Sequence, residues 1–267
     1  MIPVGDSTRR RRTPWVNYLF ILANIAIFAY MLSLAIRIDD RSPAQVQQDF
    51  AEQRATVCYG FPAPPTPSDE FVCRWAFQPR EFFDAAGGAS PGGQDRLAVL
   101  ITIVTSMFLH GGWLHIGGNM LFLWVFGDNV EDRLGHLPYA LFYLAAGGVA
   151  ALIQGAIDTS SLIPVLGASG AVAGVLGAYL IWYPRATVNV VIPFFVLIFI
   201  PLPVPAFIMI GLWFVQNLLA GYATITDAAS PGGGVAWFAH IGGFVFGMLI
   251  AALVAFARIG RPPPRWR

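Results

Sequence analysis

Long apolar runs separated by short polar segments extend over most of the chain. A helix needs about 20 apolar residues to cross about 30 Å of hydrocarbon. Six runs are long enough, and they lie near residues 16–36, 113–130, 137–157, 166–184, 203–222 and 235–257. The first exceeds the apolar core of a signal peptide, about 7–15 residues, so we expect it to remain as a span. The pattern predicts an all-α polytopic membrane protein with six transmembrane helices.

A seventh apolar run, from Val188 to Ile200, has 13 residues and is followed by Pro201, Pro203 and Pro205. A run of this length is typical of a re-entrant or interfacial segment rather than of a full crossing. The sequence therefore favours six spans and leaves seven as the alternative.

The composition fits an integral membrane protein and excludes other classes. Of the 267 residues, 56% are hydrophobic and 12% are charged, against about 25% charged in soluble domains. A net charge of +1 gives no electrostatic support for nucleic-acid binding. All 16 basic residues are Arg, so a Schiff base or a Ser-Lys dyad is excluded.

The arginines predict how the chain crosses the membrane. They are frequent in the tails 1–14 and 258–267, and Arg133 and Arg185 lie in short connections between spans. The long segment 37–112 holds six Arg but nine acidic residues. Because basic residues favour the cytoplasmic side, we expect both tails in the cytoplasm and the 37–112 loop outside.

Four polar residues interrupt the apolar spans: His115 and Asn119 in the second, Ser169 in the fourth and His240 in the sixth. Polar and ionisable groups within a membrane are costly, which makes them functional candidates. Spans two, four and six run in the same direction, so all four residues lie roughly 5–10 Å below the outer surface. A clustering of polar residues near membrane ends would explain this depth, but not the combination of residue types.

Ser169 and His240 have the chemistry of a nucleophile and its base. A serine hydroxyl is a weak nucleophile until an adjacent base removes its proton, and histidine is the usual base. Small residues that let helices approach closely recur at Ser169, Ala173 and Gly177 in one span, and at Gly243 and Gly247 beside His240 in the other. The alternative is that these residues form packing stripes only.

His115 and Asn119 are suited to stabilise an oxyanion. They are four residues apart and project from one helix face. A ring N–H, an amide NH2 and the backbone N–H of Ser169 are the donors that acyl transfer requires. His110 is off this face, and we expect it to make a structural loop hydrogen bond.

The expected site has no carboxylate. Asp and Glu are absent from the second, fourth and sixth spans at this depth, since Asp158 and Asp227 lie in loops. The sequence therefore predicts a Ser-His dyad rather than a triad.

Three motifs in this order resemble those of the rhomboid family of intramembrane serine proteases. They are His110-Gly111-Gly112-Trp113-Leu114-His115-Ile116-Gly117-Gly118-Asn119, Gly167-Ala168-Ser169-Gly170 and Ala239-His240-Ile241-Gly242-Gly243. The stretch from Phe126 to Asp132 is similar to that of bacterial members, so the expected location is a bacterial inner membrane. The resemblance implies a protease domain over residues 15–257, and a membrane-embedded loop within residues 37–112.

The resemblance also implies roles and partners. Ser169 would be the nucleophile and His240 the base, with His115 and Asn119 in the oxyanion site. The substrates would be transmembrane proteins in the lipid bilayer, cut with water and without a cofactor or metal. Trp213 would be a gate residue for substrate entry, or else an interfacial anchor.

The chain departs from the family pattern at Ala173. Many members carry an aromatic residue at this position, four after the nucleophile, where it stacks on the catalytic imidazole. The His240 ring must therefore be held in another way, or be less firmly held.

Two further features carry predictions. Cys58 and Cys73 lie in the outer loop, where a disulfide is favoured over two free thiols. Glu131 and Arg133, at the cytoplasmic end of the second span, are expected to be solvated or interfacial.

Two other functions compete with proteolysis. A catalytically silent relative would bind transmembrane helices without cutting them, but such relatives are expected to lose the nucleophile or the base. A transporter would show related halves and a polar site at the midplane, and the sequence shows neither.

Overall fold

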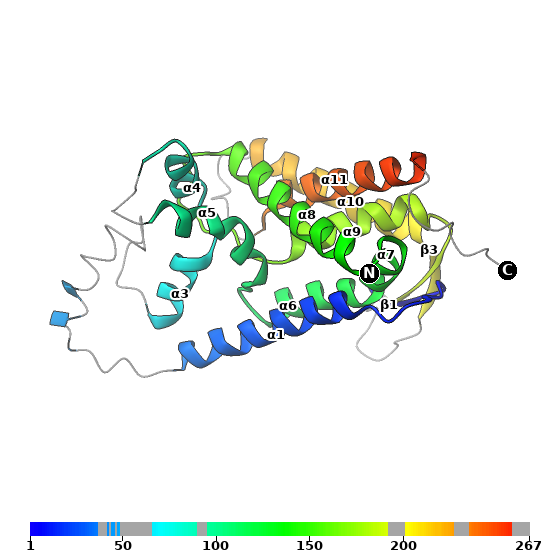
Figure 1. Cartoon of the computed structure of the whole chain (residues 1–267), viewed down its shortest axis with the longest axis horizontal. Helices are drawn as coiled ribbons and strands as arrows, with labels where there is room; N and C mark the ends of the chain where they lie inside the picture. Colours follow the sequence, from blue (N-terminus) through cyan, green and yellow to red (C-terminus); the bar gives the residue numbers. More distant parts are fainter. Residues whose placement is uncertain are drawn as a thin grey trace. The chain divides into compact units, whose positions relative to one another are not determined.

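The computed structural model describes residues 1–36, 42, 44–45, 47–48, 66–89, 95–191, 201–226 and 235–257, and these are mainly helical (Figure 1). The helices are α1 (Trp15–Ala35), α3 (Pro67–Trp75), α4 (Pro79–Ala86), α5 (Arg96–Thr105), α6 (Trp113–Phe122), α7 (Asp128–Leu134), α8 (His136–Ile157), α9 (Ser169–Trp182), α10 (Ala206–Thr226) and α11 (Trp237–Phe256). A 3₁₀ turn, Ser106–Phe108, follows α5, and a π-helical stretch, Leu123–Gly127, joins α6 to α7. Three short strands are β1 (Ile2–Asp6), β2 (Thr187–Val191) and β3 (Leu202–Pro205).

The predicted polytopic helical membrane protein is confirmed. Among the described residues, α1, α8, α10 and α11 are each long and apolar enough to cross a membrane. Residues 96–108 and 113–134 form a further apolar pair, bent by 80° at the break. A described helix overlaps each of the six predicted runs.

The fourth run forms a shorter helix than the predicted span 166–184. Helix α9 has 14 residues. Gly167, with a φ of +122° that suits glycine, precedes it, and Pro184 follows it. Because a residue before proline is disfavoured in the helical conformation, the helix ends at Trp182.

The described chain divides into two compact units. Unit 1 comprises residues 1–21, 117–150 and 169–267, and unit 2 comprises residues 22–116 and 151–168. Unit 1 therefore holds α9, α10, α11 and the three strands, and unit 2 holds α3, α4 and α5.

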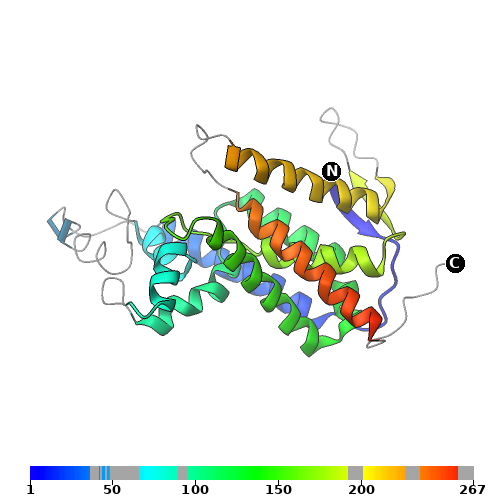
Figure 2. The same ribbon diagram turned by 90° about the horizontal axis from the view of Figure 1, so that it is seen from above.

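Helices α9 and α11 of unit 1 lie side by side (Figures 1 and 2) and are separated only by glycines. A Cβ atom added to Gly243 would lie 2.0 Å from the carbonyl oxygen of Gly170, and one added to Gly247 would lie 1.9 Å from that of Gly174. A Cβ on Gly177 would lie 2.1 Å from the Phe244 carbonyl oxygen. No larger residue fits at these positions without moving a helix.

This glycine seam corrects part of the predicted packing stripe. The close contacts of α11 do involve Gly243 and Gly247. Those of α9 run through Gly170, Gly174 and Gly177, one residue on from the predicted Ser169 and Ala173. Gly170 meets Gly243, and four residues further along each helix Gly174 meets Gly247. Helices α9 and α11 therefore run in the same direction.

The three strands form an antiparallel sheet in the order β1-β2-β3, which the sequence analysis did not predict. Ile2 pairs with Val191, and Thr187 pairs with Pro205. The apolar run 188–200 thus begins as strand β2, and residues 192–200 lie outside the described residues. Alternation of buried Val188 and Val190 with exposed Asn189 is the period-2 pattern of a strand.

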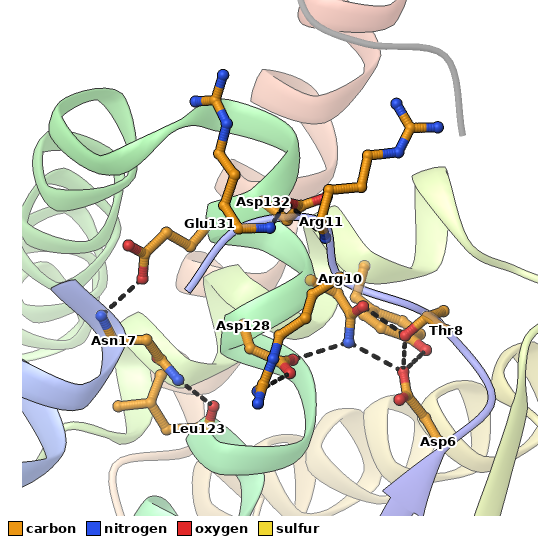
Figure 3. Close-up of polar contacts among 12 residues, drawn as sticks. Asp6, Thr8, Arg10, Arg11, Asn17, Leu123, Asp128, Glu131 and Asp132 are labelled. Atoms are coloured by element: carbon orange, nitrogen blue, oxygen red, sulfur yellow. Dashed lines mark hydrogen bonds and ion pairs between the residues drawn. The ribbon is translucent and has the colours of Figure 1, made fainter. Parts of the chain in front are cut away.

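The predicted tail before α1 is anchored in unit 1 (Figure 3). The Asp6 carboxylate accepts hydrogen bonds from Thr8, Asn129 and Tyr179. Tyr179 belongs to α9, so this network joins the N-terminal segment to the end of α9 that is remote from Ser169. Burial is the main cause that raises the pKa of Asp6.

Glu131 is 1% exposed, so the prediction of a solvated side chain was wrong. Its two carboxylate oxygens accept from the backbone N–H groups of Val16 and Asn17 at 3.1 and 2.7 Å. These N–H groups lie in the first turn of α1, where intrahelical acceptors are missing. Arg133 is half-buried, with its guanidinium 5.3 Å from the centre of the Trp182 ring.

Unit 2 has its own small core. Phe77, Phe82 and Ala151 are buried together, and Phe77 and Val165 exchange backbone hydrogen bonds. Cys73 is buried in α3. Cys58 lies outside the described residues, so the disulfide remains a prediction.

Candidate active site

Ser169 is the first residue of α9 and is half-buried. The backbone before it is fixed in unit 2, where the Gly167 N–H donates to the carbonyl oxygen of Ser106 at 2.9 Å. The N–H groups in the first turn of a helix lack intrahelical acceptors. The start of α9 therefore offers backbone donors next to a serine hydroxyl.

His240 is the fourth residue of α11 and is also half-buried. Its neighbour Ala239 faces the residue after Ser169, because a Cβ on Gly170 would lie 3.7 Å from the Ala239 carbonyl oxygen and 3.8 Å from the Ala239 Cβ. The structure thus brings the chain beside Ser169 against the chain beside His240. Both residues lie in the first turns of two helices that run together.

The His240 imidazole has a hydrogen-bond partner that the sequence analysis missed. Its Nδ1 lies 2.7 Å from the side-chain oxygen of Asn217, which belongs to α10. Asn217 is 3% exposed, and its amide nitrogen donates to the Trp213 carbonyl oxygen at 2.7 Å. An amide inside the apolar span 203–222 is itself a functional candidate, so the rule that singled out Ser169 could have found it.

Two indole rings surround the same imidazole. The Trp213 ring centre is 5.9 Å from that of His240, with the planes at 34°. The Trp237 ring centre is 6.1 Å away and its plane is nearly perpendicular, at 89°. Aromatic contacts from α10 and α11 therefore surround the imidazole, although position 173 is alanine.

The predicted oxyanion residues fall in different units. Asn119 belongs to unit 1 and is 7% exposed, and its amide nitrogen has no hydrogen-bond partner among the described residues. His115 belongs to unit 2, where its ring lies edge-on to that of His110 at 5.0 Å. Both are on α6, one turn apart.

His110 is 1% exposed. Neither of its ring nitrogens has a hydrogen-bond partner in the described part of the chain. The backbone of Phe108 lies close enough to interact with the ring, so the expected loop hydrogen bond of His110 stays a prediction.

The helices that carry the site are free of carboxylates and arginines. Besides His240, the titratable side chains of α9, α10 and α11 are Tyr179 and Tyr222. The contacts of His240 described above are thus with a neutral amide and two aromatic rings. Across the described ranges, no three His, Cys, Asp or Glu side chains are grouped to hold a metal ion.

Comparison with known proteins identifies the relatives of this chain. The Rhomboid domain family model matches residues 98–256. Rhomboid protein 1, mitochondrial, of Saccharomyces cerevisiae is 32% identical over 160 residues, 58% of this chain and 42% of the yeast protein. Rhomboid-type serine protease 2 of Emericella nidulans is 28% identical over 211 residues, 76% of this chain and 37% of that protein. The matched regions thus span less than half of these relatives.

Proposed function

The chain belongs to the rhomboid family, and on that premise we propose that it is an intramembrane serine endopeptidase. It hydrolyses peptide bonds in or next to the transmembrane segments of other membrane proteins. Ser169 is the nucleophile and His240 the general base of a dyad. One relative is named as a serine protease, which supports this reaction class.

The reaction proceeds as in other serine hydrolases. His240 takes the proton of the Ser169 hydroxyl while the oxygen attacks the scissile carbonyl. Amide and imidazole donors of Asn119 and His115, with the Ser169 backbone N–H, stabilise the oxyanion. His240 then protonates the leaving amine, and water hydrolyses the acyl-enzyme by the same steps in reverse order.

The observation that carries this proposal is the surroundings of His240. Its ring lies in the first turn of α11, hydrogen-bonded to a buried amide and next to the glycine seam with the helix that begins at Ser169. The hydrogen bond fixes the orientation of the ring, and the helices that pack around it carry no carboxylate or arginine that would hold it in one protonation state. A base requires a fixed orientation and a pKa suited to the working pH.

The proposal includes a location. The chain is a membrane protein, and we place it in a bacterial inner membrane with both termini cytoplasmic and the active site toward the outer face. The arginines of the two tails support this orientation. A C-terminal reporter that is active only in the cytoplasm tests it, and activity of a periplasmic reporter at that end contradicts it.

The test of the reaction uses purified protein in liposomes with a transmembrane substrate. Ser169→Ala and His240→Ala should each abolish cleavage, whereas Ser160→Ala, an exposed serine in the loop before α9, should cleave like the wild type. A fluorophosphonate probe should label the wild type and not Ser169→Ala. Cleavage that survives either dyad substitution contradicts the assignment, and an unlabelled, inactive wild type favours a silent protein that binds transmembrane helices.

A further inference from the structure

We propose that Asn217 is a positioning residue, whose side-chain oxygen holds the His240 imidazole so that Nε2 is the basic nitrogen available to Ser169. This inference rests on the proposed function, because it adds a third member to the same Ser-His site. It replaces the predicted dyad by a Ser-His-Asn arrangement contributed by α9, α11 and α10.

The orientation of the Asn217 amide follows from its other contact. The amide nitrogen lies 2.7 Å from the Trp213 carbonyl oxygen, which can only accept hydrogen bonds. A flipped amide would place two acceptors against each other. The Asn217 oxygen must therefore face His240.

The tautomer of His240 follows from the orientation of Asn217. An oxygen 2.7 Å from Nδ1 is an acceptor, so Nδ1 must carry the proton. In a neutral imidazole the other nitrogen then has the free lone pair. That nitrogen, Nε2, is the one that a general base uses when Nδ1 is held by an orienting acceptor.

A neutral amide suits this place better than a carboxylate. Asn217 is 3% exposed, and a buried charge would need a compensating partner. Helices α9 and α10 pack against α11, and besides His240 the titratable side chains of these three helices are Tyr179 and Tyr222. An amide fixes the tautomer without bringing a charge into this apolar region.

The indole contacts add to the hydrogen bond from Asn217 in holding the ring. Trp213 is tilted over the imidazole and Trp237 lies edge-on to it, so rotation of the ring is restricted on two sides. Trp213 also supplies the carbonyl that orients Asn217. The α10 segment 213–217 thus takes over the support that position 173 does not provide.

The test separates positioning from packing by two substitutions at one position. Asn217→Leu keeps similar volume and removes the acceptor. We expect kcat to fall about 10- to 100-fold with KM within about twofold, less than the roughly 10⁴-fold loss when a triad acid is replaced. Asn217→Asp keeps an acceptor toward Nδ1, but its second oxygen meets the Trp213 carbonyl oxygen, so it should recover part of the lost kcat.

The pH profile gives a second readout. The Asn217→Asp carboxylate favours the protonated imidazole, so the acid limb of kcat/KM should move to higher pH. Gln216→Ala, a change of the exposed neighbouring amide, is the matched control and should leave kcat and the pH profile unchanged. A folded Asn217→Leu protein with wild-type kcat overturns the proposal, as does an equal loss of kcat in both Asn217 variants with an unmoved acid limb.

A third readout does not depend on activity. Nitrogen-15 NMR of His240 in a Ser169→Ala background should show the proton of the neutral ring on Nδ1, and additional substitution Asn217→Leu should release it to Nε2. The proposal is overturned if the neutral His240 ring has no proton on Nδ1 in the Ser169→Ala protein that retains Asn217. This holds even if the Asn217→Leu variant does not fold. Failure of the probe to label wild-type Ser169 would remove the protease assignment while leaving this measurement of Asn217 intact.

Discussion

The two ends of helix α9 are built from different kinds of polar group. At its start, Gly170 beside Ser169 packs against Ala239 beside His240, and the His240 ring contacts an amide and two indoles. At its other end, Tyr179 donates to the Asp6 carboxylate. Asn129 donates to the same carboxylate, and Arg10 pairs with Asp128. These contacts join the N-terminal segment to the rest of unit 1 (Figure 3).

On the proposed function, this difference reflects two tasks. A base must lose and regain a proton, so neighbouring charges that fix its protonation state are unfavourable, and neutral groups orient it instead. An anchor has to resist detachment of a chain segment, and charge-assisted hydrogen bonds are about twice as strong as neutral ones. Substitutions at the Ser169 end should therefore reduce activity per folded molecule, and those at the Tyr179 end should reduce stability.

The largest effect should come from the glycine seam, because it serves both ends. Gly247→Leu places a side chain where the Gly174 carbonyl oxygen lies 1.9 Å from the first added atom. We expect loss of at least about 3 kcal/mol of stability, the upper range for overpacking, together with loss of cleavage. Thermal unfolding in detergent measures the first and the liposome assay the second.

The control for this prediction is Gly211→Ala on α10, where an added Cβ meets no atom within 4 Å. It should keep activity and gain about 0.5–1 kcal/mol in helix stability. Wild-type stability and cleavage in Gly247→Leu would show that the seam does not position the two helices.

The second prediction isolates the anchoring end. In the wild type, each carboxylate oxygen of Glu131 accepts from one N–H group, of Val16 or of Asn17. Glu131→Gln keeps only one side-chain oxygen and removes the charge. Because hydrogen bonds to charged groups contribute about 1.5–3 kcal/mol each, we expect unfolding at lower denaturant concentration, with unchanged kcat in the folded fraction. The control is Asp84→Asn, at an exposed carboxylate 3.9 Å from Arg80, which should change neither the unfolding midpoint nor kcat. A fall in the kcat of folded Glu131→Gln protein, with no such fall in Asp84→Asn, would contradict the division of tasks.

The third prediction concerns pH. Burial raises the pKa of Asp6 above its ordinary value of 3.8, so the folded protein keeps this proton at pH values where the unfolded chain has lost it. The resulting stabilisation is present below about pH 4 and is lost as pH rises through the raised pKa. Unfolding temperatures should therefore fall less with rising pH in Asp6→Asn than in the wild type. An identical pH slope in the two proteins would exclude Asp6 as its source.

The smallest effect should follow from Arg10→Ala. The ion pair with Asp128 is 3.1 Å long, but the arginine side chain is 45% exposed, and exposed pairs contribute about 0–1 kcal/mol. We expect a shift of that size in unfolding, reduced further by salt, and no change in cleavage. A larger loss would mean that Arg10 acts on the whole carboxylate network rather than on Asp128 alone.

The helices could be predicted because they depend on local sequence, and the candidate reactive residues were selected by the same local reasoning. Apolar runs of sufficient length specify the spans, and a polar residue within such a run is conspicuous. The same reasoning would have made Asn217 a functional candidate. Its actual partner could not be deduced, since it depends on how α10 packs on α11.

The anchoring end could not be predicted for the opposite reason. Glu131 binds backbone groups 114 and 115 residues away in sequence, and strand β1 pairs with a strand about 185 residues further on. Such pairings depend on the assembled unit and leave no periodic pattern in a segment of five residues. The sequence therefore does not reveal that the N-terminal segment pairs with the start of the run 188–200.

The glycine seam determines which helix of the site can change position. Carbonyl oxygens in contact with glycine backbones leave α9 and α11 no room to approach or rotate, whereas α10 meets α11 through side chains such as the stacked rings of Phe214 and Phe244. An outward displacement of α10 would carry Asn217 away from His240 and leave the seam unchanged. On the proposed function, displacement of α10 would thus also release the base, and cleavage would stop until the helix returned.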